Sequence, residues 1–231
     1  MGMILADLVQ QQLGDLARFQ EQALGLPKAV VIAADANFLV SRICPVIGKV
    51  SRLVPNCRFE LKTMRTDDIL DALHQQTVSL GFIPNVAKAK GLRTKPLFDL
   101  RYGVFVPDRL VPRGGTLTAE RALRDCPHVL DESDEVLRRG LIVTAETLRV
   151  QFKPTMTCSS QVECIAAVRS GFYASVLPLS VSIVDCELRI VDEPVFDMLS
   201  YKVAVSWNER HCSVNPHVET IREALSESLQ D

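Results

Sequence analysis

Three polar residues lie at predicted helix starts, where a protein can hold a small anion. Asn37, Thr66 and Ser159 each follow an apolar or mixed run and precede an amphipathic segment. Such residues cap helices, and the free N–H groups of a first helical turn, at the positive end of the helix dipole, hold anions without a fixed cation. For each residue alone, a cap without ligand contact is an equally good interpretation. As a set, they predict part of a small-molecule site.

The sequence shows no arrangement for catalysis. The four histidines lie far apart, and none belongs to a recognisable motif: they are His74, His128, His211 and His217. G-x-S-x-G, H-E-x-x-H and P-loop patterns are absent from the printed sequence. We therefore expect surface or structural histidines, no enzymatic activity, no catalytic residue and no metal site.

The cysteines do not form a disulfide framework. Their number is odd, their spacings are scattered and no C-x-x-C pair occurs: they are Cys44, Cys57, Cys126, Cys158, Cys164, Cys186 and Cys212. This usage is typical of reduced thiols in a cytosolic protein. Small buried side chains are the favoured interpretation over a sensor thiol, although a redox pair formed in space stays open.

Composition indicates a globular chain without a membrane segment. The 231 residues are 47% hydrophobic and 23% charged, which suffices for an ordinary core. A net charge of −2 and a pI near 6.1 make the chain a poor non-specific binder of nucleic acid. No apolar run approaches the roughly 18–20 residues of a membrane span, and the first residues do not read as a signal peptide. We therefore expect a cytoplasmic protein.

The residues around Asn37 and Thr66 belong to a β-α-β-α-β pattern at 28–84. Apolar or mixed runs predict parallel strands, and the amphipathic segments between them predict crossover helices at 37–54 and 66–76. Pro45 should kink the first helix. In such a sheet, ligands bind at the carboxyl ends of the strands, where both helices begin.

A second α/β region follows an extended segment at 97–106 that is broken at Gly103. Thr118 begins a helix, and strands are expected at 127–130, 153–158 and 173–178. One helix is expected around Val136, a second, separate helix is expected to begin at Thr144, and a third is expected at 161–171. A basic loop is expected at 85–96. The strand at 201–207 then returns the chain to the first region, where a helix at 216–229 docks. Two crossings predict two lobes with a hinged cleft.

Residues 4–24 predict an amphipathic helix that ends before Pro27. It is interpreted either as packing on its own domain or, in preference, as a connector or dimerisation helix. The predicted organisation is a linker helix at 1–27, lobe I at 28–105 and 206–231, and lobe II at 106–205.

Longer stretches resemble a known family. They are AVVIAADANFLVSRICPVIGKVSRLVPNCRFEL, TDDILDALHQQTVSLGF, LFDLRYGVFVPDRL and SSQVECIAAVRSGFYASVLP. Their order and spacing resemble the effector-binding domain of LysR-type transcriptional regulators over nearly all of residues 28–230. The proline inside the first helix, the ending at Val168–Pro178 and the return strand with Trp207 also match, and residues 4–24 are similar to the family's linker helix.

The resemblance implies a fold of two Rossmann-like lobes joined by two crossover strands, as in type 2 periplasmic binding proteins. It implies a sensor that holds a small effector, often a carboxylate, between the lobes and shifts the arrangement of a dimer or tetramer. The three helix starts would face that cleft, and Asp131, Ser133 and Thr157 would contact the ligand from the second lobe. No cofactor other than the effector, whose identity the sequence leaves open, is implied.

Two departures from the family pattern affect these expectations. No winged helix-turn-helix precedes the linker, so we interpret the chain as a fragment that reaches operator DNA only through a missing N-terminal domain. Ser79 replaces a frequent acidic residue, and Asp35 and Ala36 replace small hydroxyl residues before the first helix. A solute-binding protein of a transport system, which has the same two-lobed plan, is the alternative.

Overall fold

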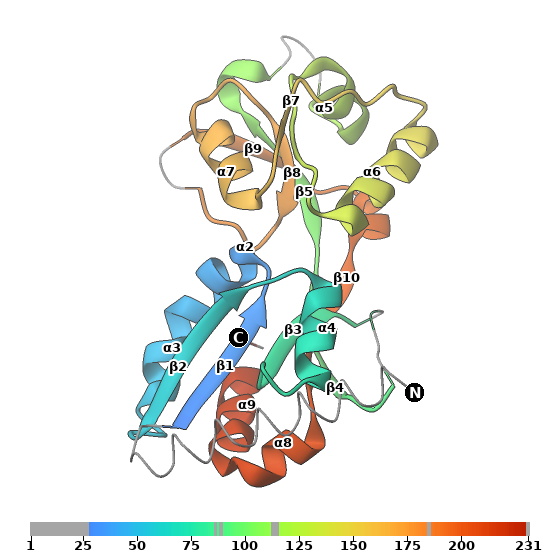
Figure 1. The fold of residues 1–231 in the computed structure, drawn as a ribbon. Coiled ribbons are helices and arrows are strands. Elements are labelled where there is room, and N and C mark those ends of the chain that lie inside the picture. The colour runs from blue at the N-terminus through green and yellow to red at the C-terminus, as the bar shows by residue number, and fades with distance from the viewer. Residues whose placement is uncertain (1–27, 86, 88–89, 112–115, 184–185, 230–231) are drawn as a thin grey trace. The chain divides into compact units, whose positions relative to one another are not determined.

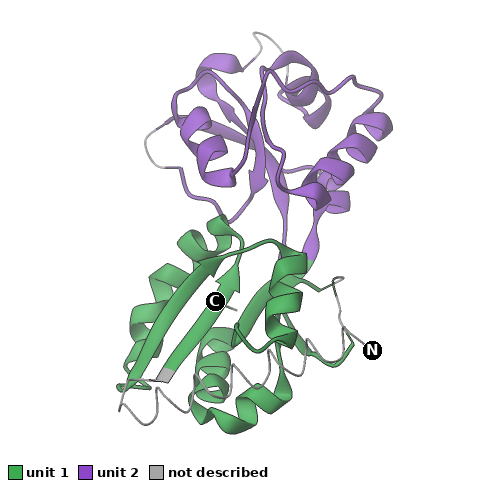
Figure 2. Ribbon diagram, viewed as in Figure 1, with its two compact units in different colours: residues 1–98, 202–231 green, residues 99–201 purple. Residues whose placement is uncertain are grey.

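The computed structural model describes residues 28–85, 87, 90–111, 116–183 and 186–229 (Figure 1). The helix predicted at 4–24 lies outside them. The chain divides into unit 1, residues 1–98 and 202–231, and unit 2, residues 99–201 (Figure 2). The chain passes from one unit to the other twice. Unit 1 is therefore formed from two separate segments of the sequence, and unit 2 is the single segment that lies between them in the sequence.

Unit 1 is built on a five-stranded sheet with the order β2-β1-β3-β10-β4. The strands are β1 (Lys28–Ala34), β2 (Cys57–Thr63), β3 (Leu80–Pro84), β4 (Arg93–Leu100) and β10 (Tyr201–Trp207). β1 pairs in parallel with β2 and β3, and β10 pairs antiparallel with β3. The predicted parallel β-α-β-α-β core and the returning strand are therefore confirmed. Ile32 and Leu80 are fully buried partners in this register.

The strand order explains how the helices cover this sheet. The crossover from β1 to β2 and the crossover from β2 to β3 run in opposite directions along the sheet. Right-handed connections therefore place α3 (Cys44–Ser51) and α4 (Thr66–His74) on opposite faces. The last helix, α9 (Pro216–Ser228), packs against α3 (Figure 1). As predicted, it docks on unit 1, where its Arg222 guanidinium stacks over the Trp207 ring at 4.4 Å from the ring centroid.

The first predicted helix is not one α-helix with a kink at Pro45. A short α2 (Ala36–Phe38) leads into a π-helical turn (Leu39–Ile43), and α3 follows. The Cys44 N–H bonds Leu39 O, five residues back, directly before a proline that has no N–H to donate. The wider turn accommodates the ring that would clash with an α-helical turn.

Two further predictions about element bounds were wrong, and one helix was not predicted. The basic loop ends earlier than predicted, because β4 begins at Arg93, whose guanidinium pairs with Glu209 at 3.0 Å. The extended segment breaks at Arg101 and not at Gly103. Helix α8 (Glu209–Val214) was not predicted, since six residues are too few to show a clear helical period.

Unit 2 contains an antiparallel sheet β8-β5-β9 and a parallel pair β6-β7. The strands are β5 (Tyr102–Pro107), β6 (Val129–Asp131), β7 (Met156–Cys158), β8 (Ser175–Pro178) and β9 (Leu188–Val191). A parallel bridge between His128 and Ala174 joins β6 to the start of β8. Gly103 lies inside β5, where a Cβ would come within 2.8 Å of the Val191 carbonyl oxygen, so the position requires glycine.

The helices of unit 2 begin at polar caps. They are α5 (Ala119–Asp125), α6 (Glu135–Leu148) and α7 (Gln161–Arg169). The predicted separate helix start at Thr144 is wrong: Thr144 is buried inside α6 and its hydroxyl donates to Gly140 O at 2.9 Å. A 3-10 helix (Pro194–Leu199) that was not predicted packs against α6. Gly171 ends the turn after α7 with φ +78°, as the predicted helix stop requires.

Candidate ligand-binding site

The sequence predicted Asn37 as the cap at the start of the first helix, and this prediction was wrong, because Asp35 caps α2. Asp35 follows β1 with an extended backbone, and its Oδ1 accepts the Phe38 N–H at 2.9 Å. Asn37 is half-buried inside the first turn, and its carbonyl accepts the Ser41 hydroxyl at 2.7 Å. The residue that replaces a family hydroxyl therefore occupies the cap. The sequence had marked Asp35 only as a departure from the family pattern, and not as a cap or a site residue.

The start of α4 has no side-chain cap. Its N-cap is Arg65, so Thr66 is the first helical residue and not the cap. Thr66 is half-buried and Arg65 is exposed. The Met64 N–H bonds Ala34 O at 3.0 Å, which fixes this segment beside the end of β1. Helix α4 therefore presents first-turn N–H groups, a hydroxyl and a guanidinium at one strand end.

Asn85 lies at the same carboxyl edge of the sheet and was missed in the sequence. It directly follows β3, and its N–H donates to Lys202 O at 2.7 Å. Its Oδ1 is buried and has no hydrogen-bond partner in the structure. A buried amide oxygen without a donor costs free energy, which a bound O–H or N–H group would relieve. The sequence placed Asn85 in the basic loop, which hid its position at a strand end.

In unit 2, the structure brings four predicted residues to one edge. Asp131 ends β6 opposite Cys158 of β7, so Ser133, Thr157 and Ser159 lie around the ends of the same strand pair. Asp131 is 7% exposed, and its Oδ1 accepts from the Ser133 N–H at 2.8 Å and from the Ser133 hydroxyl at 2.6 Å. Ser133, Thr157 and Ser159 are exposed.

Ser160, which follows Ser159, caps α7 through its hydroxyl. This oxygen accepts the Glu163 N–H at 3.4 Å. In return, the Glu163 carboxylate accepts the Ser159 N–H at 2.9 Å. That hydrogen bond lowers the pKa of Glu163, because it stabilises the charged form. Ser159, which the sequence predicted as the helix start, therefore lies one position before the cap.

Most of these helix starts do not offer the free N–H groups that the sequence predicted for anion binding. Asp35 caps α2, Asp134 caps α6 through the Leu137 N–H at 2.9 Å, and Glu163 occupies the start of α7. At each of these starts, a carboxylate of the chain already uses an N–H group and offsets the helix dipole. Only the start of α4 among these four combines uncapped N–H groups with a basic side chain, although Asp67 and Asp68 lie in its first turn.

Within the described parts of the chain, no three His, Cys, Asp or Glu side chains are grouped to hold a metal ion. No described helix is long and apolar enough to cross a membrane. The histidines His128 and His211 are buried in different units. Their surroundings are those of structural residues: His128 Nε2 lies 2.9 Å from Ala122 O and His211 Nε2 lies 3.1 Å from Ser79 Oγ.

The fold and its strand-end residues correspond to a sensor domain of transcriptional regulators. The family model "LysR substrate binding domain" matches residues 25–230. The chain therefore belongs to the LysR substrate-binding domain family, whose members are effector-binding domains of transcriptional regulators with a fold like that of periplasmic binding proteins. No curated relative matches the chain in sequence.

Solved structures agree on the fold. CbnR, a LysR family transcriptional regulator, is 13% identical, with 98% of this chain and 78% of that chain covered and a TM-score of 0.68. HinK from Pseudomonas aeruginosa, also a LysR family transcriptional regulator, is 18% identical, with 98% and 80% covered and a TM-score of 0.68. The reduced form of OxyR from N. meningitidis is 19% identical, with 87% and 95% covered and a TM-score of 0.69.

Proposed function

We propose that this effector-binding domain recognises a small metabolite with an anionic group, and that the uncapped start of α4 receives that group. The observation that carries the proposal is the combination of Arg65, Thr66 and free first-turn N–H groups where β2 ends. Backbone N–H groups at a helix N-terminus and a guanidinium both favour a carboxylate or phosphate. Asn85 supplies a second polar contact at the same sheet edge through its unpartnered Oδ1.

We propose that unit 2 supplies groups that favour hydrogen-bond donors of the effector and disfavour its anionic group. Asp131 and the hydroxyls of Ser133, Thr157 and Ser159 lie together at the ends of β6 and β7. A carboxylate that is 7% exposed repels an anion and accepts hydrogen bonds from hydroxyl or ammonium groups. The proposed effector is therefore a small acid that also carries hydrogen-bond donors, such as an amino or hydroxy acid.

A thermal-shift screen of small carboxylates, amino acids and aromatic acids tests this proposal. A ligand at 100 times its Kd stabilises the folded chain by about 2.7 kcal/mol, so the melting temperature should rise with the logarithm of its concentration. Arg65→Gln and Thr66→Val should each reduce the shift strongly. Arg52→Gln, which removes another exposed arginine of unit 1 after α3, is the matched control and should retain it. An equal shift in all three variants would contradict a site at α4.

We further propose that effector binding changes the assembly of a dimer or tetramer in the cytoplasm, and that operator DNA is bound through an N-terminal DNA-binding domain. Exposed apolar side chains support self-association: Val136, Ile142 and Val143 on α6 are 44%, 49% and 48% exposed. Light scattering on the purified protein should give a mass above that of one chain. The double variant Val136→Ser, Val143→Ser should have a lower mass. The exposed Lys153→Ser is the control. A monomer that binds its ligand would favour the solute-binding alternative.

A further inference from the structure

Two cysteine thiols meet in unit 2. The Sγ atoms of Cys158 and Cys164 lie 3.1 Å apart. Cys158 ends β7, and Cys164 lies in the first turn of α7. The contact closes the short turn that contains Ser159 and Ser160. Both sulfurs are thus held by regular elements on either side of a capped helix start.

The distance between the sulfurs fits a disulfide precursor better than a metal site. Two thiolates on one tetrahedral zinc ion, with Zn–S bonds of about 2.3 Å, lie about 3.8 Å apart. The described residues also provide no third metal-ligating side chain for this pair. A disulfide requires the sulfurs to approach from 3.1 Å to about 2.05 Å, a small movement of two side chains.

The two thiols differ in access to solvent. Cys158 is half-buried, whereas Cys164 is 1% exposed. Burial raises the pKa of the Cys164 thiol, so it is a poor first nucleophile toward an oxidant in solution. The more accessible Cys158 is the residue that meets the oxidant, and Cys164 is placed to resolve the product.

We propose that Cys158 and Cys164 form a reversible disulfide when the protein meets a peroxide. The Cys158 thiolate attacks one peroxide oxygen, the O–O bond breaks, and a sulfenic acid and one water result. The Cys164 sulfur then attacks the Cys158 sulfur, so that the S–S bond forms, the S–O bond breaks and a second water leaves. Two electrons pass from the thiols to the peroxide, and a dithiol reductant returns both thiols.

This bond would join β7 to α7 beside candidate ligand residues. Thr157 and Ser159 flank Cys158, and the Cys158 carbonyl accepts the Glu132 N–H at 3.0 Å. Any effect of oxidation on effector affinity rests on the proposed function. Formation of the disulfide does not, because it depends only on the two sulfurs and the oxidant.

Peptide mapping of the full chain, treated with one equivalent of hydrogen peroxide and then alkylated, tests the proposal. Both cysteines fall in one tryptic peptide, residues 150–169, because Lys153 precedes Pro154. This peptide should lose two hydrogen atoms in mass and escape alkylation. Cleavage after Glu163 should leave its halves joined until a dithiol is added.

Cys57 and Cys186 are matched controls, since both are half-buried and their sulfurs contact backbone carbonyl oxygens of Arg58 and Glu187. Cys57→Ser and Cys186→Ser should keep the linked peptide, whereas Cys158→Ser should abolish it. Oxidation of wild-type protein that stops at sulfenic or sulfinic acid on Cys158, or that links other cysteines, would overturn the proposal. The wild-type map decides this even if a variant fails to fold, and it needs no effector.

Discussion

The Oγ of Ser79 and the Nε2 of His211 lie 3.1 Å apart inside unit 1. The same hydroxyl oxygen accepts the Val31 N–H at 3.2 Å, and Ser79 is 2% exposed. Ser79 therefore ties β1 to α8 through the segment before β3. The position at which the family often has an acidic residue is thus a packing position in this chain, and not part of the ligand edge.

Ser79→Ala should lower the free energy of unfolding by about 1–3 kcal/mol, because it removes a hydrogen-bond partner from the part-buried Val31 N–H and from the buried His211 ring. Urea unfolding at neutral pH measures the change. Ser51→Ala is the control, since the exposed Ser51 hydroxyl bonds only the nearby Gly48 carbonyl among its recorded contacts, and it should change stability much less. Equal effects would contradict the role of Ser79.

His128 should make the protein less stable in mild acid. Its Nε2 donates to Ala122 O at 2.9 Å, and its Nδ1 is buried without a partner. Burial lowers the pKa of His128 from 6.5 to about 4, because the charged ring would lose its hydration inside unit 2. Between these two values the unfolded chain binds more protons than the folded one, so stability falls as the pH drops.

The expected loss from this histidine is about 2 kcal/mol between pH 7.5 and pH 5. Urea unfolding at both pH values measures it. His128→Leu should be less stable at pH 7.5 but should lose less on acidification than wild type. His74→Gln, at an exposed histidine, should retain the wild-type dependence on pH. A His128→Leu variant with the full wild-type loss would show that other groups cause it.

The caps of α2 give a prediction that separates neighbouring residues. Asp35→Ala should cost about 1 kcal/mol, since it removes the acceptor of the Phe38 N–H. Asn37→Ala should cost little, because the structure uses the Asn37 backbone carbonyl to bind Ser41. Unfolding free energies of the two variants measure the difference. A larger loss for Asn37→Ala would restore the original prediction that Asn37 is the cap.

Gly81 and Gly48 should respond in opposite directions to alanine. A Cβ at Gly81 on β3 would collide with Ile69 Cγ2 and approach Leu73 Cδ1 at 3.0 Å, where α4 packs on the sheet. Overpacking of this kind costs about 1–3 kcal/mol. A Cβ at Gly48 meets nothing within 4 Å, and Gly48→Ala inside α3 should stabilise by about 1 kcal/mol. Thermal unfolding measures both variants.

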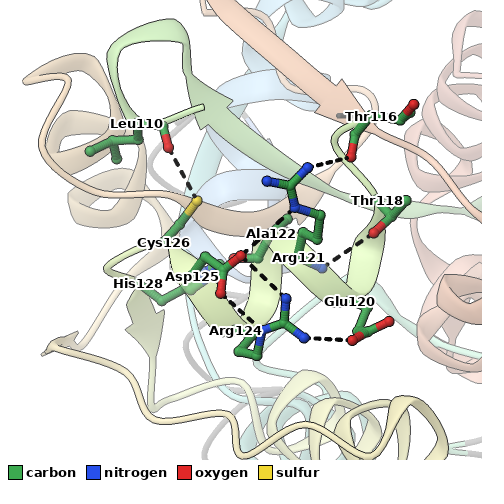
Figure 3. A network of polar contacts seen from close by, with 10 residues as sticks. All are labelled: Leu110, Thr116, Thr118, Glu120, Arg121, Ala122, Arg124, Asp125, Cys126 and His128. Atoms are coloured by element: carbon green, nitrogen blue, oxygen red, sulfur yellow. Dashed lines mark hydrogen bonds and ion pairs between the residues drawn. The ribbon is translucent and has the colours of Figure 1, made fainter. Parts of the chain in front are cut away.

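Helix α5 allows a cap to be compared with surface ion pairs (Figure 3). Thr118 Oγ1 accepts the Arg121 N–H at 3.3 Å, and Thr118→Ala should cost about 1 kcal/mol. Arg124 pairs with Glu120 at 2.6 Å and with Asp125 at 2.9 Å on the surface. Solvent screens such pairs, so Arg124→Gln should leave the urea midpoint nearly unchanged. The reverse order of effects would contradict this assignment.

The periodicity of apolar residues predicted most of the fold. The run at 201–207 is strand β10 without change of bounds, and the β-α-β-α-β core of unit 1 has the predicted parallel pairing. Long, apolar runs are informative because burial on both faces dominates their choice of structure. The π-helical turn before Pro45 was not predictable, since its wide hydrogen bond has no signature in hydropathy.

The candidate site was harder to predict, because cap chemistry depends on one dihedral angle at one residue. Asn37 and Asp35 are both good caps by type, and only the extended backbone of Asp35 selects it. Asn85 was missed because its unpartnered oxygen is a tertiary property. The neighbourhood of Asp131 and Thr157, by contrast, follows from parallel pairing of two strands that sequence had already located.

The division of the chain into units also sets the order in which they fold during synthesis. Unit 2 is one contiguous segment, residues 99–201, whereas unit 1 needs residues from Lys202 onward. Chains emerge from the ribosome from the N-terminus, and domains generally fold as complete units. A nascent chain that ends before Lys202 therefore exposes β3 without its neighbour β10, so unit 2 can complete its fold before unit 1 does.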